Sequence, residues 1–173
     1  MKHAYDEMYL EDAMENMGEM LDYAVNVCHM DIDEFWKLFL SSGMADEFAK
    51  GSPRAVCGLS GVEMMYTVLH KVGLEENGFP VQIEYRRSRE YWSGWILAYY
   101  QWLSGKRFQD IYAGMNMKEI QRLYPTLHEA SEEKFVEIAD KILEKNITST
   151  HSLDRLQISR MYRPQCIGET GNL

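Results

Sequence analysis

One segment of the sequence brings together residue types that bind metal ions. His128 and Glu129 begin the run His-Glu-Ala-Ser-Glu, and such a pair activates a metal-bound water when a second histidine lies one helical turn further on. Glu132 stands at that position, and no further His or Cys lies at ligand spacing. We therefore predict neither a metal site nor another cofactor. The run is interpreted as an exposed helix N-terminus, where acidic residues complement the helix dipole.

Two further segments contain nucleophiles. Gly58-Leu59-Ser60-Gly61 approaches the GxSxG turn of serine hydrolases, but Val62 replaces the second glycine and no strand is expected before the turn. Cys28 and His29 are a thiol and a base, but adjacent residues on a helix point roughly 100° apart. The sequence therefore predicts Ser60 as a helix cap and no catalytic residue.

The densest group of candidate binding residues is aromatic. Its members, considered for ligand or partner contact, are Tyr91, Trp92, Trp95, Tyr99 and Trp102. In one interpretation they form the core stripe of a central helix over 89–104, in which Gly94 and Ala98 leave room for a neighbouring helix. In the other, Tyr91, Trp95, Tyr99 and Trp102 line a pocket for a small ligand, with cations from Arg86, Arg87 and Arg89. Burying a large aromatic side chain gains about 1.5–3 kcal/mol, which favours the core.

Helical spacing of apolar residues places these candidates on helices. We predict helices over 9–28, 31–43, 62–73, 89–104 and 126–145, with shorter helices between them. Ser60 with Glu63 and Asn116 with Glu119 form capping pairs at two helix starts. Pro125 is predicted to end the helix that precedes it.

Two segments interrupt this pattern. Val81, Ile83 and Tyr85 alternate with polar residues, as in a short strand or an extended connector. Residues 147–151 are polar and β-branched, which is typical of a linker. The expected fold is all-α, a multi-helix orthogonal bundle with at most one short β or extended segment near 81–85. We expect a helical domain over 1–146, a linker over 147–151 and a separate short unit over 152–173.

The charge distribution is uneven. The 173 residues carry a net charge of −9, which argues against non-specific nucleic-acid binding. Residues 1–47 hold two basic and twelve acidic residues, whereas residues 86–122 hold seven basic and three acidic ones. We expect the two regions to attract each other, within one chain or between two. The predicted partners are a second copy, as a dimer, or a cognate protein.

Cysteine usage and hydropathy indicate the compartment. The three cysteines are far apart and form no CxxC pair, which favours reduced thiols in the cytoplasm. The N-terminus lacks a basic region followed by an apolar one, and no stretch approaches the roughly 20 apolar residues of a membrane span. We therefore expect a cytoplasmic protein without membrane contact.

The segment from Leu153 onward resembles the opening of an Xre/Cro-type helix-turn-helix. Leu153, Leu156 and Ile158 match the apolar positions of the first helix, and 167–169 match its Leu-Ala-Glu. Met161 stands where the family has glycine. The resemblance ends before the recognition helix, which makes the base contacts, so DNA binding by this chain alone is not expected. The residues that the resemblance implies as remnants of DNA contact are Arg155, Arg160, Arg163 and Gln165.

Two further resemblances cover most of the chain. Residues 90–102 and 124–130 are similar to an uncharacterised helical family of Gram-positive, clostridial gut bacteria, whose members often carry such a helix-turn-helix at the C-terminus. Residues 20–72 are similar to small helical proteins found beside toxin–antitoxin genes. Together they imply a non-enzymatic interaction domain of a transcriptional regulator or antitoxin-like protein, with an incomplete DNA-binding motif. The alternative is a small-ligand sensor or cryptic enzyme with an aromatic pocket around Trp95.

Overall fold

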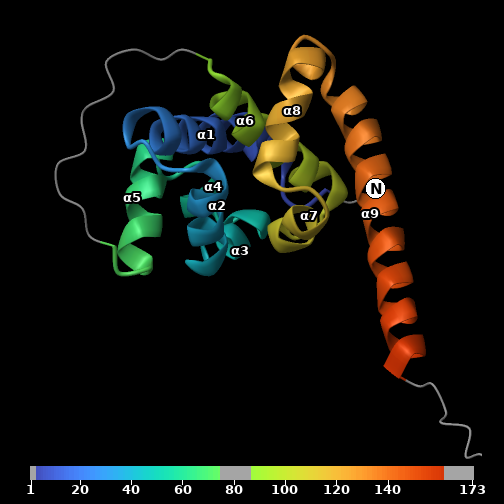
Figure 1. The fold of residues 1–173 in the computed structure, drawn as a ribbon. Helices are drawn as coiled ribbons and strands as arrows, with labels where there is room; N and C mark the ends of the chain where they lie inside the picture. Colours follow the sequence, from blue (N-terminus) through green and yellow to red (C-terminus); the bar gives the residue numbers. More distant parts are fainter. Residues whose placement is uncertain (1–2, 75–86, 162–173) are drawn as a thin grey trace, which may run out of the picture.

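The computed structural model describes residues 3–74 and 87–161, with side chains for 3–74 and 87–146. In these ranges the chain forms a bundle of helices with no strand (Figure 1), which confirms the predicted all-α class. The extended segment predicted near 81–85 lies outside the described residues. The elements are η1 (Glu7–Tyr9), α1 (Leu10–Asp22), the π-helical η2 (Tyr23–Val27), α2 (Ile32–Ser41), α3 (Met44–Ala49), α4 (Pro53–Val56), α5 (Gly61–Lys71), α6 (Arg89–Ser104), α7 (Phe108–Gly114), α8 (Met117–Leu127) and α9 (Glu132–Met161).

Helices α1 and α6 form the centre of the bundle and approach each other closely. A Cβ atom on Gly94 would lie 2.3 Å from the backbone oxygen of Met17, and one on Gly18 would lie 2.9 Å from that of Tyr91. Because a side chain at either position would collide with backbone, the two glycines permit this contact. The structure therefore confirms the predicted close approach at Gly94.

Local signals at helix ends were predicted correctly. The Ser60 hydroxyl accepts from the backbone N–H of Glu63, whose carboxylate accepts from the backbone N–H of Ser60. Asn116 and Glu119 form the same reciprocal pair at the start of α8. The Ser88 hydroxyl caps α6. These contacts join residues three apart, so a short stretch of sequence is enough to specify them.

The end of α8 differs from the prediction. The helix continues through Pro125 to Leu127, and the closing helix begins at Glu132 instead of Thr126. Proline lacks an N–H, so the carbonyl of Gln121 loses its helical partner. This loss falls in the last turn of α8, where burial of Leu127, which is 4% exposed, offsets it.

The segment 147–151 also differs from the prediction, because it continues α9 without a break. No glycine or proline interrupts residues 132–161. Isoleucine, serine and threonine lower helix stability by only a few tenths of a kcal/mol each, so their presence does not terminate a helix that is already formed. The predicted linker is therefore helical backbone.

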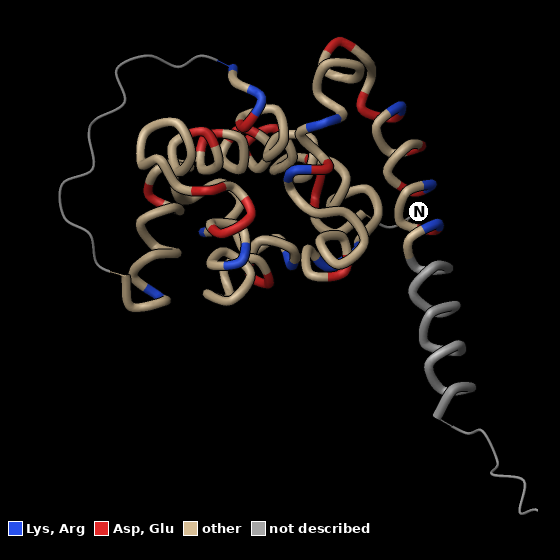
Figure 2. Tube along the Cα trace, in the orientation of Figure 1, with Lys and Arg blue, Asp and Glu red and all other residues tan. Residues whose placement is uncertain are grey.

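The acidic and basic regions meet within one chain where α2 and α8 pack together. Nζ of Lys118 lies 2.8 Å from Oδ2 of Asp31 and 3.9 Å from Oδ2 of Asp33, and Asp33 also accepts from the backbone N–H of Met117. Figure 2 shows the positions of the charged residues along the chain. The expected attraction therefore operates in part inside the bundle.

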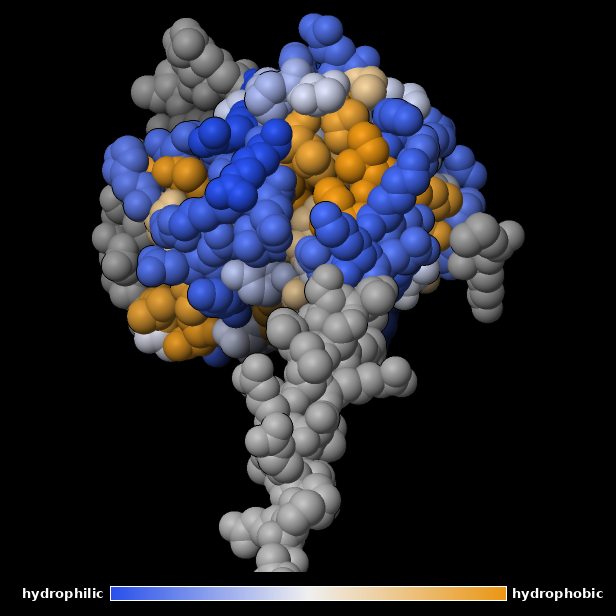
Figure 3. Space-filling view, turned by 45° about the vertical axis from the view of Figure 1, so that its right-hand side comes forward, coloured by the Kyte–Doolittle hydropathy of each residue, from blue (hydrophilic) through white to orange (hydrophobic). Residues whose placement is uncertain are grey.

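Apolar residues reach the surface on the side of α9. Figure 3, in which this side is turned forward, shows a hydrophobic area between two hydrophilic bands. Partly buried apolar residues of α8 and α9 pack against the core; they include Leu123, Val136, Ile138 and Ile142. No helix in the described part of the chain has the length and apolar character needed to cross a membrane.

Candidate functional site

The aromatic residues of α6 lie in two environments. Trp92 and Trp102 are buried, with 8% and 4% of their surface exposed, whereas Tyr91, Trp95 and Tyr99 are partly exposed. Positions 91, 95 and 99 are each four residues apart and form one line along the helix. The core interpretation therefore holds for the two buried tryptophans. The line of Tyr91, Trp95 and Tyr99 is accessible from the surface.

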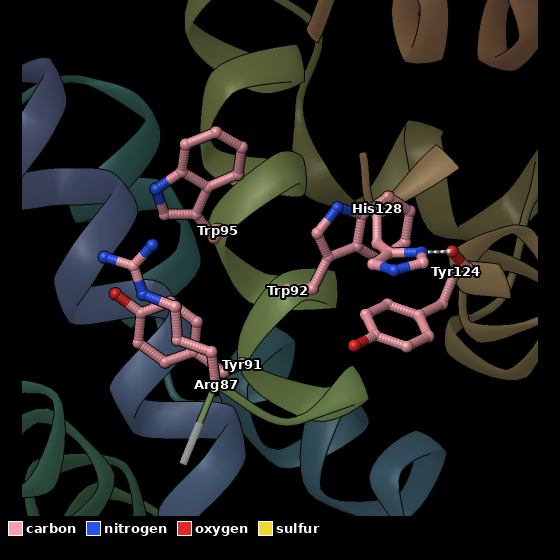
Figure 4. A pocket seen from close by; sticks show the side chains of 6 residues that line it. All are labelled: Arg87, Tyr91, Trp92, Trp95, Tyr124 and His128. Atoms are coloured by element: carbon pink, nitrogen blue, oxygen red, sulfur yellow. Dashed lines mark hydrogen bonds between the residues drawn. The ribbon is translucent and has the colours of Figure 1, made fainter. Parts of the chain in front are cut away.

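Part of this accessible line borders a pocket of about 220 Å³, drawn in Figure 4. Its lining consists of Arg87, Tyr91, Trp92, Trp95, Tyr124 and His128. Arg87 lies just before α6, and Tyr91, Trp92 and Trp95 lie on it. Tyr124 and His128 come from the C-terminal end of α8. The pocket therefore lies where the start of one helix meets the end of another.

Stacked rings form the wall on the side of α8. The rings of Tyr124 and His128 stack with centroids 4.6 Å apart, and Trp92 meets Tyr124 edge-on at 5.5 Å. Nδ1 of His128 lies 2.8 Å from the backbone oxygen of Tyr124. Because a carbonyl oxygen only accepts, Nδ1 carries a proton in this contact, while Nε2 lies 3.7 Å from Oε1 of Glu129.

Tyr91 and Trp95 form the opposite wall, with Arg87 at its edge (Figure 4). A Cβ atom on Gly18 of α1 would lie 3.0 Å from the ring of Tyr91, so the glycine makes room for this ring. Burial raises the pKa of Tyr91, and the charge of Glu15 raises it further against the opposing effect of Arg87. The phenol is therefore protonated at neutral pH and acts as a hydrogen-bond donor.

Several polar groups of the pocket have no hydrogen-bond partner among the described residues. None of the hydrogen bonds among the described residues uses the indole N–H of Trp92 or Trp95, or the hydroxyl of Tyr91 or Tyr124. In Figure 4 the nitrogen-bearing edge of the Trp92 ring faces the side of Trp95. Nε1 of Trp92 is not among the fully buried unpaired atoms of the described residues, so solvent reaches this N–H from the pocket and a bound molecule can accept from it.

A polar cluster around the buried side chains of Asp22 and Glu90 lies next to the pocket, at the start of α6. The amide of Asn26 donates to Oδ1 of Asp22 at 2.8 Å and to Oε2 of Glu90 at 3.2 Å. The amide of Gln121 donates to Oε1 of Glu90 at 2.8 Å, and the Ser88 hydroxyl donates to Oδ1 of Asp22. The cluster therefore joins α1, η2, α6 and α8, and it fixes the two helices that carry the pocket.

Glu90 is the charged centre of this cluster. Burial on its own would raise the pKa of Glu90, but the hydrogen bond from Asn26 and the guanidinium of Arg89, 3.2 Å away, bring it below its ordinary value. The carboxylate is therefore ionised at neutral pH. Sequence reasoning missed the cluster because Asn26 and Gln121 lie 64 and 31 residues from Glu90. An acidic residue in the first turn of the most apolar helix was its only local signal.

The remaining predicted pocket residues lie elsewhere. Trp102 is covered by the N-terminal segment: its indole N–H donates to the backbone oxygen of Tyr5 at 2.9 Å, and its ring centroid lies 3.7 Å from that of His3. Tyr99 packs beside Trp102, with ring centroids 5.9 Å apart. Of the four residues predicted to line a ligand pocket, Tyr91 and Trp95 border the pocket of Figure 4, and Tyr99 and Trp102 are not among its lining residues.

The residues considered for catalysis or metal binding lie at the ends of helices. Ser60 is the N-cap of α5, as predicted. His128 is the C-cap of α8, so the expectation that it begins a helix is wrong, although the residue is exposed as predicted. His29 follows the π-helical turn with a positive φ of 56°. Among the described side chains, no group of three or more His, Cys, Asp or Glu could hold a metal ion.

The residues implied as remnants of DNA contact lie near the C-terminal end of the chain. Arg155 and Arg160 fall within α9, beyond the last residue whose side chain is described. Arg163 and Gln165 lie outside the described residues. The prediction of a partial helix-turn-helix over 152–173 therefore stays a prediction, and the pocket is the site that the geometry supports.

Comparison with known proteins provides no further assignment. No protein-family model, curated protein or solved structure matches the chain. Any function for the pocket is therefore inferred from its own residues.

Proposed function

We propose that this chain is a non-enzymatic protein-interaction domain of a regulatory protein, and that its contact surface is centred on the pocket between α6 and α8. The observation that carries this proposal is the set of partly exposed aromatic residues around a hollow of about 220 Å³. Tyrosine, tryptophan and arginine are the residues that dominate binding energy at protein interfaces, and they do so when they surround a pocket that excludes water.

The packing of the site supports a preformed contact surface. Trp92 is held edge-on between Tyr124 and Phe135, with centroid distances of 5.5 and 5.8 Å. The buried cluster around Glu90 fixes the start of α6 to α8. A partner side chain therefore enters a rigid hollow, and less conformational entropy is lost on binding.

The regulatory role of the proposal comes from the resemblances of the sequence. A transcriptional regulator or antitoxin-like protein in the cytoplasm would use this domain to bind a second copy or a cognate protein. The acidic residues that remain exposed on α1 are suited to a basic partner surface, and they include Glu11, Asp12 and Glu15.

The concave shape of the pocket also favours a second candidate function, that of a small-ligand sensor. Ligand pockets are typically lined by aromatic residues with a few polar groups, which this lining provides. A sensor would retain a small molecule through purification, which native mass spectrometry detects as an added mass. A partner-binding domain would be free of such a mass and would form a protein complex.

Affinity capture with tagged variants tests the interaction proposal. We expect wild type to retain a protein partner or a second copy, and Trp95→Ala to lose it. The matched control is Met8→Ala, which removes a hydrophobic side chain that is 72% exposed and far from the pocket in sequence. Sedimentation velocity at low and high salt measures self-association. A wild-type monomer under all conditions, with the same captured proteins as Trp95→Ala, would contradict the proposal.

A further inference from the structure

The lining of the pocket is rich in hydrogen-bond donors and lacks carboxylates. The two indoles and the guanidinium of Arg87 only donate, whereas the two phenol hydroxyls can donate or accept. A ligand that satisfies these groups must present acceptor atoms. A cationic ligand would meet the guanidinium of Arg87 directly, whereas the carboxylates that act on Tyr91, those of Glu15, Glu19 and Asp22, lie outside the lining.

The position of Arg87 supports this assignment. Its side chain lies at the edge of the pocket, beside Tyr91 and Trp95 (Figure 4). The residue is exposed, and no carboxylate among the described residues forms an ion pair with it. Arg89, two residues on, is already paired with Glu90 at 3.2 Å. Among the described residues at this site, Arg87 is therefore a cation available to bind an anion.

The volume and the walls define the apolar part of the ligand. A cavity of about 150 Å³ lined by apolar side chains accepts benzene. The pocket, at about 220 Å³, therefore has room for one ring and a short substituent. The stacked Tyr124 and His128 on one side, and Tyr91 with Trp95 on the other, present aromatic surfaces that favour a planar ring in offset or edge-on contact.

We propose that the pocket binds a small planar aromatic ring that carries a carboxylate, with the ring against Trp95 and Tyr124 and the carboxylate on Arg87. This inference rests on the proposed binding function and names the chemistry of its ligand. The same group occurs in free aromatic acids and at the C-terminus of a chain that ends in an aromatic residue. A carboxylate on a guanidinium forms a charge-assisted, often bidentate, hydrogen bond.

The four tryptophans allow a direct test with the intact protein, since each indole N–H gives one nuclear magnetic resonance signal. Phenylacetate is the probe, and benzylamine and cyclohexylacetate are its controls, which change the charge and the planarity of the ligand. We expect phenylacetate to shift the signals of Trp92 and Trp95 in a saturable way. The signals of Trp36, which is buried, and of Trp102, which is bonded to Tyr5, should stay unchanged and serve as internal references.

Variants assign the carboxylate contact. Arg87→Gln should weaken phenylacetate binding about tenfold or more, because it removes a charge-assisted hydrogen bond. It should leave the weaker binding of benzyl alcohol unchanged. Arg54→Gln is the matched control, since Arg54 is an exposed arginine on α4 that does not line the pocket. Equal affinities of wild type and Arg87→Gln for phenylacetate would overturn the assignment.

Two peptides identify the source of the carboxylate. Gly-Gly-Phe with a free C-terminus should bind and its C-terminal amide should not, if a chain end is the natural ligand. Binding of phenylacetate without the peptide supports a free aromatic acid. Shifts of Trp92 and Trp95 by benzylamine alone would overturn the ligand chemistry but leave the proposed binding function intact. Absence of shifts with every probe would overturn this inference. The proposed interaction function is tested separately, by the capture experiment with Trp95→Ala.

Discussion

The two ends of α6 use tryptophan in opposite ways. At the C-terminal end, the indole N–H of Trp102 donates to Tyr5, and the backbone oxygen of Trp102 accepts from the backbone N–H of Ala4. At the N-terminal end, the indole N–H groups of Trp92 and Trp95 have no partner within the described residues, and a pocket lies beside them. One helix therefore has a closed end and an open end.

In this helix the segment that covers an aromatic residue, more than the residue type, decides whether the residue is structural or available for binding. An N-terminal segment packs over Trp102 and supplies the acceptor that a buried N–H requires, since leaving it unpaired costs about 1–3 kcal/mol. At the open end, α8 contributes Tyr124 and His128 to the pocket beside the tryptophans.

The largest effect is expected where both ends depend on one contact, the packing of α1 on α6. Gly94→Ala places a Cβ atom 2.3 Å from the backbone oxygen of Met17, so the helices must move apart. We expect the free energy of unfolding to fall by about 3 kcal/mol or more, as measured by urea denaturation. Gly114→Ala is the control, because its Cβ atom would collide with the terminal Cδ2 atom of the Leu143 side chain, at 2.5 Å, and would lie at an ordinary contact distance of 3.7 Å from the backbone. Equal losses for the two variants would show that backbone collision is not the cause.

The next largest effect distinguishes the two ends directly. Trp102→Phe leaves the carbonyl of Tyr5 without its donor and removes buried surface, so the free energy of unfolding should fall by about 1–3 kcal/mol. Trp95→Phe breaks no hydrogen bond and leaves an aromatic ring at a partly exposed position. Its effect should stay within about 0.5 kcal/mol. If Trp95→Phe destabilises the protein as much as Trp102→Phe, the open end is structural.

The sequence was sufficient to predict the features of α6 that depend on neighbours in the chain. Ser88 and Gly105 mark its ends, and the aromatic spacing identifies it as the core helix. The same spacing does not reveal which aromatics are covered, because the cover of Trp102 comes from Tyr5, 97 residues away. Such a contact depends on the tertiary packing of several helices, which local periodicity does not encode.

The sequence did not predict the α8 side of the pocket, Tyr124 and His128, because the end of that helix was placed too early. Ending the helix before Pro125 separates Tyr124 from His128 and places the histidine in the following helix. In the structure the two rings stack because α8 continues for two residues past Pro125, which brings positions 124 and 128 onto one face. A rule that weighs only the lost N–H of proline overlooks the burial of Leu127. The error in one boundary therefore concealed the site.

A smaller effect is expected from the charge that supports the open end. Glu90→Gln should lower the free energy of unfolding at pH 7 by about 1–2 kcal/mol, because Asn26 and Arg89 lose a charged acceptor. The pKa of Glu90 is lowered in the folded protein, so its contribution is complete above the unfolded-state pKa of about 4.3 and is lost as the pH falls through the folded-state pKa. The variant should therefore lose less stability than wild type on acidification to pH 3, as measured by urea denaturation across pH.

Glu129→Gln is the control for this prediction. Its side chain is 89% exposed, so the substitution should leave both stability and its pH dependence unchanged. A Glu90→Gln variant with the acid sensitivity of wild type would show that the ionised carboxylate of Glu90 does not contribute to the free energy of unfolding. The cluster would then not be what fixes α6 to α8.

The smallest effect on stability, and the sharpest contrast between the ends, is expected from the two histidines that pack on aromatic rings. His128 stacks on Tyr124 at the open end, and His3 lies over Trp102 at the closed end. His128→Ala should change the free energy of unfolding by no more than about 0.5 kcal/mol, since the residue is exposed. It should shift the indole N–H resonance of Trp92, which shares the Tyr124 wall, and leave that of Trp102 unchanged. His3→Ala should do the reverse. If either variant moved both resonances, the two ends would be one coupled unit, and the open end could not exchange solvent for a ligand without disturbing the closed one.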